Sequence, residues 1–187
     1  MGGVDKAALR VGGITLLDRV LGSARPLCER LVVVGPARPT EVPGVTFVAE
    51  DAPGGGPVPA VLAGVGASTG SDVVLVLATD LPLLTTGDLR RLLDALTASG
   101  GEVVAAADSE GPNPLLAAYR VPALMARAAA QGLGAGSPAS RMLPSPLLTL
   151  DLGPATLNVN LPADLTAAVA ADALRTGVIP PGQGDVG

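Results

Sequence analysis

The only lysine of this sequence lies close to its beginning, directly after a pair of glycines. Residues 1–6 read Met-Gly-Gly-Val-Asp-Lys, whereas the other eleven basic residues are all arginines. A lysine after a glycine-rich turn can neutralise phosphate oxygens, while backbone N–H groups of Gly2 and Gly3 approach the same anion. A solvated lysine in a loose terminus is the simpler interpretation. Because a compact ammonium differs from the guanidinium used elsewhere, the residue type favours a specific role for Lys6.

Asp80 is a second candidate, because it follows a strongly apolar run at residues 73–77, Val-Val-Leu-Val-Leu. In α/β proteins, ligands bind in the loops at the carboxyl ends of the strands. A carboxylate there supplies the hard oxygen that Mg²⁺ prefers, with other ligands coming from phosphates and water. A turn or capping aspartate ahead of Pro82 explains the residue about equally well. Asp80 is therefore a candidate metal ligand.

Two further polar segments contain candidate site residues. Asp51 precedes three glycines at 54–56, which allow close backbone approach to a ligand or simply form a loop. Asn158 and Asn160 stand at alternate positions ahead of Pro162. Alternate residues of an extended segment point to one side, so both amides can line a pocket, although turn formation is the simpler explanation.

The composition excludes several classes of chemistry. The chain of 187 residues has no histidine and a single cysteine, so histidine bases and metal ligands, internal disulfides and a cysteine zinc site are excluded. One Phe, one Tyr and a net charge of −5 leave neither the stacking groups nor the basic patch that nucleic-acid binding needs. No apolar run reaches the roughly 18 residues of a membrane span, and no secretory signal begins the chain. We therefore predict a soluble cytoplasmic protein.

The segments between these polar groups alternate between strand and helix patterns. Continuous apolar runs, typical of strands covered on both faces, occur at 31–34, 45–48, 73–77, 103–106 and 115–119. Apolar residues at helical spacing or after an initial proline predict helices at 14–24, 58–68, 86–98, 122–130 and 162–175. Thr86 is the expected cap of the third helix. This order predicts a doubly wound α/β fold, with one domain over residues 1–176 and a flexible tail at 177–187.

In their order and spacing, the polar segments resemble the nucleotidyltransferase family of molybdenum cofactor guanylyltransferases. That family carries M-G-G-x-D-K, E-D, G-P-L-A-G, D-x-P and N-x-N-x-P-x-D-L along its chain. The corresponding segments here are residues 1–6, Glu50-Asp51, Gly56-Pro57 ahead of Ala63-Gly64, Asp80-Leu81-Pro82 and residues 158–165. Each motif alone is weak, but the ordered set extends over residues 1 to about 170 and is fairly specific.

The resemblance implies a Rossmann-like nucleotidyltransferase fold with a mixed, mostly parallel sheet and helices on both faces. It also implies Mg²⁺-dependent transfer of GMP from GTP to the terminal phosphate of molybdopterin, with proteins that deliver or receive the cofactor as partners. Lys6 and Asp80 would be the catalytic residues, with Lys6 on the GTP phosphates and Asp80 on Mg²⁺. The other implied contacts are Gly2, Gly3 and Asp51 with the nucleotide, Asn113 with the acceptor, and Asn158 and Asn160 with the acceptor or the metal.

The chain also departs from the family pattern. The family's first strand and its L-A-G-G loop should precede Met1, so we expect translation to begin upstream and strands of this chain to lack hydrogen-bond partners. Gly35 stands where some relatives have a base-contacting asparagine, and Asn113-Pro114 stands where many have His-Pro. Leu161 replaces a capping threonine. A cytidylyltransferase for the same cofactor and a non-catalytic nucleotide-binding module are therefore alternatives.

Overall fold

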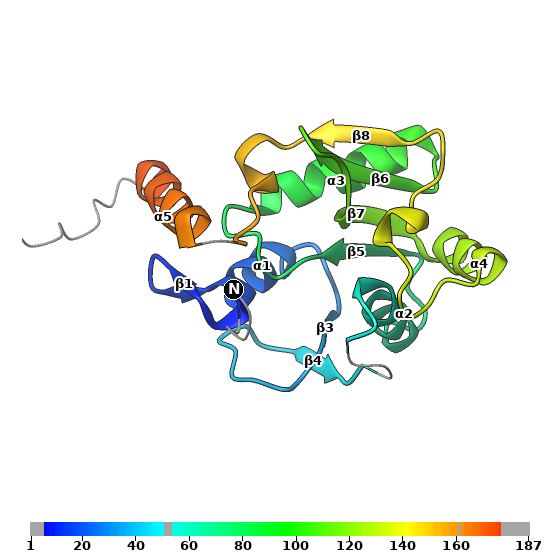
Figure 1. Ribbon diagram of the computed structural model, residues 1–187, viewed down its shortest axis with the longest axis horizontal. Helices are drawn as coiled ribbons and strands as arrows, with labels where there is room; N and C mark the ends of the chain where they lie inside the picture. Colours follow the sequence, from blue (N-terminus) through cyan, green and yellow to red (C-terminus); the bar gives the residue numbers. More distant parts are fainter. Residues whose placement is uncertain (1–5, 51–53, 161, 177–187) are drawn as a thin grey trace, which may run out of the picture.

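Strands and helices alternate along the computed structural model, which describes residues 6–50, 54–160 and 162–176 (Figure 1). The strands are β1 (Arg10–Val11), β2 (Ile14–Thr15), β3 (Leu31–Val34), β4 (Val45–Val48), β5 (Val73–Leu77), β6 (Val103–Asp108), β7 (Gly111–Arg120) and β8 (Leu148–Asp151). The α-helices are α1 (Leu16–Ala24), α2 (Pro57–Ala67), α3 (Thr86–Ser99), α4 (Val121–Gln131) and α5 (Pro162–Thr176). Short 3-10 helices are η1 (Lys6–Ala8), η2 (Ala139–Met142) and η3 (Gly153–Thr156). The expected tail at 177–187 lies outside the described residues. No helix within those residues is long and apolar enough to cross a membrane.

The expected α/β fold with a mixed sheet is confirmed. Four strands pair in the order β5-β7-β6-β8, and β3 pairs with β4 in a separate parallel pair. Strand β7 runs antiparallel to both β5 and β6, and β8 runs parallel to β6. Three strands of the larger sheet therefore share one direction and only β7 opposes them, as a mostly parallel sheet requires.

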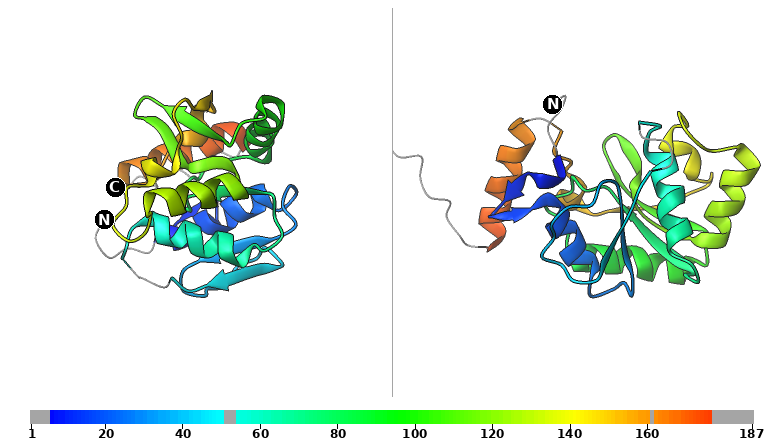
Figure 2. Two further views of the ribbon diagram at one scale, coloured as in Figure 1. Left: turned by 90° about the vertical axis from the view of Figure 1, so that its right-hand side faces the viewer. Right: turned by 90° about the horizontal axis from the view of Figure 1, so that it is seen from below.

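Helices cover both faces of the larger sheet. Val104 of β6 and Leu116 of β7 pack in a cluster with buried residues of α1 and α3. Their sequence neighbours Val103 and Ala117 pack in a second cluster with residues of α2 and α4. The two views of Figure 2 show these helix pairs on opposite sides of the strands. Because successive strand residues point to opposite faces, continuous apolar runs are what this layering needs.

A groove lies between the β3–β4 pair and the four-stranded sheet, whereas β1 and β2 form a separate hairpin. Within the described residues, β3 pairs with β4 alone and β5 pairs with β7 alone, so each strand has one edge without a partner strand. Residues of both strands line the same cavity of about 650 Å³, together with residues of α1 and α2. All five residues of β5 are only half-buried, although the strand lies among helices.

Three local features differ from the sequence-based expectation. The cap of α3 is Thr85, one residue before the expected Thr86. The segment at 14–15 forms the second strand of a hairpin, so α1 begins at Leu16, where Thr15 caps it. Strand β8 was not expected, because its residues are mostly exposed and form no continuous apolar run. Strands of two residues and exposed edge strands leave little hydrophobic periodicity to detect.

The cap of α3 provides a test of local stability. Thr85 Oγ1 accepts a hydrogen bond from Asp88 N, and the Asp88 carboxylate accepts one from Thr85 N, so the two residues form a capping box. Thr85→Ala is expected to lower the free energy of unfolding by about 1 kcal/mol. Thr97→Ala is the control, because this exposed hydroxyl bonds only within the helix, to Leu93 O. Urea denaturation compares them, and equal stabilities of the two variants would contradict the capping role.

Candidate active site

Lys6, Asp80 and Asn160 lie together, although 154 positions separate the first from the last. Lys6 Nζ donates a hydrogen bond of 2.8 Å to Asn160 Oδ1 and lies 3.6 Å from Asp80 Oδ2. The side chains of Lys6 and Asp80 keep 33% and 19% of their surfaces exposed, so a ligand can reach both from solvent. The three residues form a partly open cluster of one cation, one carboxylate and one amide.

Asp80 is fixed by the segment on each side of it. It follows β5, and Ala78 N donates a hydrogen bond of 2.7 Å to Leu115 O, which extends the pairing of β5 with β7. Residues 81–84 are all buried behind it. The Asp80 carbonyl accepts a hydrogen bond of 3.0 Å from Val159 N. This bond ties the Asp80 loop to the segment that carries Asn160.

Asn160 is held from the opposite side by helix α5. Its backbone N–H donates a hydrogen bond of 2.8 Å to Asp164 Oδ2, in the first turn of the helix. Val159 beside it is completely buried. The buried neighbour and the backbone bond leave the exposed Asn160 amide directed at Lys6.

The other asparagines of the predicted site take different positions. Asn158 is half-buried, two residues before Asn160 in the same extended segment. Asn113 lies on β7, where its Oδ1 accepts a hydrogen bond of 2.8 Å from Leu115 N. Leu115 lies two residues after Asn113, and its carbonyl accepts a hydrogen bond from Ala78 N, two residues before Asp80. The predicted nucleotide contacts Gly2, Gly3 and Asp51 lie outside the described residues.

The oxygen ligands of the cluster suit a magnesium ion that arrives with a phosphate ligand. Asp80 Oδ2 and Asn160 Oδ1 are hard oxygens, and both lie beside the Lys6 ammonium. The described residues contain no group of three or more His, Cys, Asp or Glu side chains that could hold a metal. In many phosphoryl-transfer sites Mg²⁺ takes one or two carboxylates and completes its shell with phosphates and water. Asp80 fits that arrangement as a single carboxylate ligand.

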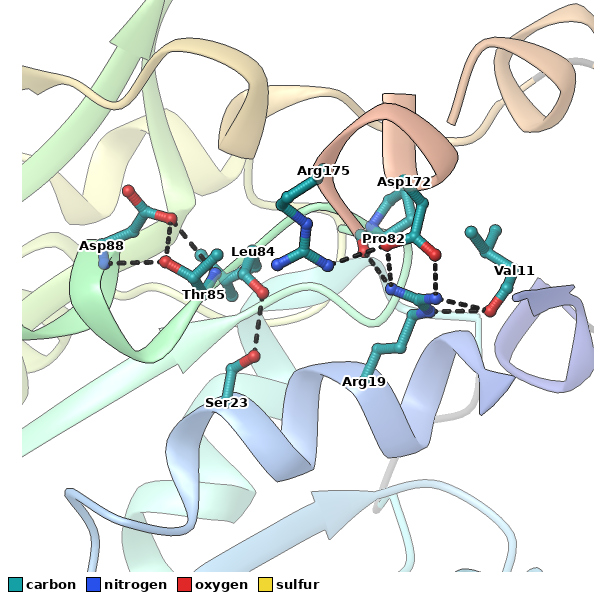
Figure 3. A network of polar contacts seen from close by, with 9 residues as sticks. All are labelled: Val11, Arg19, Ser23, Pro82, Leu84, Thr85, Asp88, Asp172 and Arg175. Atoms are coloured by element: carbon teal, nitrogen blue, oxygen red, sulfur yellow. Dashed lines mark hydrogen bonds and ion pairs between the residues drawn. The ribbon is translucent and has the colours of Figure 1, made fainter. Parts of the chain in front are cut away.

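The half-buried guanidinium of Arg19 connects several segments of the chain (Figure 3). From α1 it donates to both carboxylate oxygens of Asp172 on α5, at 3.0 and 2.6 Å. It also donates to Val11 O, at 2.9 and 2.7 Å, and to Pro82 O at 3.4 Å. Arg175 adds a bond of 2.8 Å to Asp172. No sequence motif indicates this network, because Arg19 lies 153 positions from Asp172.

The Arg19–Asp172 pair makes stability depend on pH. Hydrogen bonding from Arg19 lowers the pKa of Asp172 below its ordinary value of 3.8, with a further contribution from Arg175, although burial acts in the opposite direction. A lowered pKa in the folded state contributes stability above pH 3.8, and this is lost as the pH falls through the lowered value. Asp172→Asn should therefore flatten the fall in unfolding free energy between neutral and strongly acidic pH. Urea denaturation across that range measures the slopes; parallel curves for the two proteins would contradict the assignment.

The apolar groove between β3 and β5 does not contain the cluster. Its lining includes Ala78 and Thr79 at one end, immediately before Asp80, and otherwise consists mainly of apolar residues of α1, α2 and the two strands. Lys6, Asp80 and Asn160 are not among its lining residues. The groove thus ends beside the candidate site but has a different chemical character.

Comparison with known sequences identifies relatives of this chain. Residues 1–143 match the family described as the MobA-like NTP transferase domain. A protein of Nitrobacter hamburgensis named molybdenum cofactor guanylyltransferase is 28% identical over 128 residues, which are 65% of this chain and 61% of that protein. A protein of Bradyrhizobium with the same name is 30% identical over 128 residues, covering 65% and 60% of the two chains. The match spans about 60% of the length of these curated relatives.

Solved structures share the fold. Molybdopterin-guanine dinucleotide biosynthesis protein A from Archaeoglobus fulgidus superimposes with a TM-score of 0.67 at 20% identity, covering 92% of each chain. The 2-C-methyl-D-erythritol 4-phosphate cytidylyltransferase from Thermus thermophilus gives a TM-score of 0.69 at 23% identity, covering 89% of this chain and 92% of the other. The TM-scores establish a common fold, and at identities this low the similarity establishes the fold alone.

Proposed function

The chain belongs to the family of MobA-like NTP transferase domains, and we propose on that basis that it transfers GMP from GTP to the terminal phosphate of molybdopterin. The observation that carries this proposal is the Lys6 ammonium beside Asp80 and Asn160, at the carboxyl end of β5. The carboxyl ends of strands are where α/β proteins bind their ligands. The Lys6 ammonium can neutralise the negative charge of a nucleoside triphosphate there.

The transfer can be written with the bonds balanced. An ionised oxygen of the acceptor phosphate attacks the α-phosphorus of GTP, and the bond from that phosphorus to the β-phosphate oxygen breaks. The products are the acceptor joined to GMP through a new phosphoanhydride (P–O–P) bond, and pyrophosphate. Because the acceptor oxygen is already ionised at neutral pH, no general base is needed, and the lack of histidine is no obstacle. Positioning and charge neutralisation carry such a step.

The residues of the cluster have separable roles in this proposal. Lys6 would place a positive charge beside the phosphate oxygens as negative charge moves toward pyrophosphate. Asp80 and Asn160 would hold Mg²⁺, which when bound polarises the phosphate oxygens and neutralises their charge. Asn160 currently accepts from Lys6, so it also keeps the ammonium beside Asp80. Asn113 and Asn158 would contact the acceptor, as the resemblance implies.

We also propose that a further extended segment between β3 and β5 would complete the sheet. The unpaired edges of β3 and β5 and the apolar groove of about 650 Å³ between them support this, because an extended apolar segment would satisfy both edges. Helix η1 carries Lys6, which lies beside Asp80, and Ala78 and Thr79 immediately before Asp80 line that groove.

Nucleotide preference provides the test of the proposed reaction. Residues 1–187, and the same chain extended upstream in its reading frame, are incubated with Mg²⁺, molybdopterin and either GTP or CTP, and pyrophosphate is measured. We expect release with GTP and at least tenfold less with CTP, greatest for the extended chain. Release with CTP alone would replace the proposal by cytidylyl transfer. Absence of turnover with either nucleotide in both chains would favour a nucleotide-binding module.

A further inference from the structure

The three segments that carry the Lys6–Asp80–Asn160 cluster all lead to Arg19. Lys6 lies in η1, and the chain continues from there into β1, whose Val11 carbonyl accepts two hydrogen bonds from Arg19. The Asp80 loop reaches Pro82, whose carbonyl accepts another. Asn160 is bonded to the first turn of α5, the helix that supplies Asp172. The Arg19 guanidinium is therefore hydrogen-bonded to β1, to the loop after Asp80 and to α5, the three segments that lead to Lys6, Asp80 and Asn160.

The hairpin turn between β1 and β2 is shaped around this network. Gly12 has a φ of +58°, a conformation that residues with side chains rarely adopt. A Cβ atom at Gly12 would lie 2.8 Å from both Arg19 Nη2 and Asp172 Oδ2. The turn therefore packs directly on the ion pair. The pair contacts the hairpin through its Gly12 backbone as well as through the Val11 carbonyl.

Stability alone is a weak reason for burying these charges. The side chains of Arg19 and Asp172 are only 10% and 7% exposed. A buried ion pair loses hydration, and replacing both partners by apolar groups is often neutral or stabilising. What apolar groups cannot replace is the planar fork of donors that binds a carboxylate and two carbonyl oxygens at once. The feature specific to this pair is the fixed geometry of the segments it joins.

We infer that Arg19 is a positioning residue, which sets the distance between Lys6 and the Asp80–Asn160 pair by clamping the β1–β2 hairpin, the Asp80 loop and α5. The expected effect on catalysis rests on the proposed function, whereas the clamp is defined by the hydrogen bonds of Arg19 alone. Loss of the clamp frees η1 to move relative to the Asp80 loop. Displacement of a charged group by about 1 Å can cost on the order of 100-fold in rate.

The double variant R19M/D172L tests the clamp without leaving one charge buried. Both new side chains are apolar, so we expect a thermal midpoint within about 5 °C of the wild-type value. The matched control is E102L/R127M, which removes an ion pair of 3.0 Å between α4 and the residue just before β6, where Glu102 is 57% exposed. R19K is a second variant, which keeps the charge beside Asp172 but lacks the fork that reaches both carbonyls.

The first measurement uses the fact that Lys6 is the only lysine. Acylation of its amine by sulfosuccinimidyl acetate, followed by mass spectrometry of the Lys6 peptide, reports how firmly Asn160 and Asp80 hold the ammonium. We expect the rate to rise at least about threefold in R19M/D172L and in R19K, because a hydrogen bond worth about that factor or more is loosened. The control should match wild type. Wild-type rates in both Arg19 variants would overturn the clamp.

The second measurement separates positioning from general damage. If GMP transfer occurs, kcat should fall about tenfold or more in R19M/D172L and R19K, while KM for GTP changes by less than about threefold. Unchanged kcat in folded variants would overturn the role of Arg19 in positioning. Should the wild-type chain transfer no GMP, the proposed function fails, and the acylation rates alone still decide whether Arg19 positions Lys6.

Discussion

Asp80→Asn is expected to lower the rate of GMP transfer by about 100-fold, equivalent to about 2.7 kcal/mol of transition-state stabilisation. The substitution keeps the shape of the side chain but removes the only carboxylate within 4 Å of Lys6 Nζ among the described ion pairs. An amide binds Mg²⁺ less strongly than a carboxylate because it carries no charge. The backbone bond from Val159 N to Asp80 O is unaffected by the substitution. The fold should therefore be preserved, and circular dichroism with a thermal melt checks this.

Asp94→Asn is the matched control for this prediction. Asp94 lies on the exposed face of α3 and has the same change in charge. Its transfer rate should stay within about twofold of wild type, as is usual for surface substitutions away from a site. A fall of less than tenfold for Asp80→Asn, or equal effects for the two variants, would show that Asp80 is not the metal-binding carboxylate.

Lys6→Met is expected to lower the rate by about 30- to 100-fold, because the negative charge that develops on the leaving pyrophosphate loses its neighbouring ammonium. Methionine retains an unbranched aliphatic side chain, so packing along the stem is largely preserved. Lys6 is one-third exposed, which limits any loss of stability. Steady-state release of pyrophosphate measures the effect, with GTP varied so that kcat and KM are obtained separately.

Arg10→Met controls for the general loss of one positive charge. Arg10 is exposed on β1, four positions beyond Lys6, and its guanidinium bonds to the Gly13 carbonyl rather than to the cluster. It should transfer GMP at close to the wild-type rate. The double variant K6M/D80N should be little slower than Asp80→Asn alone, because residues that act as a unit are not additive. Full additivity would mean that Lys6 and Asp80 act independently.

The sequence located the cluster because its members stand at positions set by local rules. Asp80 follows a continuous apolar strand, so the rule for ligand sites in α/β sheets applied to it directly. Asn160 was found through alternation with Asn158 in an extended segment. Lys6 was distinguished by residue type in a chain otherwise built with arginine. None of these signals predicts which distant residues come together, so the contact between Lys6 and Asn160 is visible only in the structure.

The features that the sequence did not reveal depend on contacts between distant residues or on very short elements. Arg19 and Asp172 are 153 positions apart, and neither belongs to a recognisable motif. The hairpin of β1 and β2 contains strands of two residues, too short for alternation to be visible. Thr85 and Thr86 are both suitable caps, and the choice between them depends on which can pair with Asp88. Hydrophobic periodicity predicts long helices and strands, whereas exact helix ends and very short strands depend on packing in the folded chain.

The most direct test of GMP transfer follows the phosphorus atoms of GTP. The chain, extended upstream, is incubated with molybdopterin, Mg²⁺ and GTP labelled either at the α-phosphorus or at the γ-phosphorus. Transfer of GMP predicts that the α-label enters a molybdopterin product and that the γ-label leaves as pyrophosphate, with both reduced about 100-fold in Asp80→Asn. The α-label remaining in free nucleotide, or the γ-label appearing directly as inorganic phosphate, would contradict it.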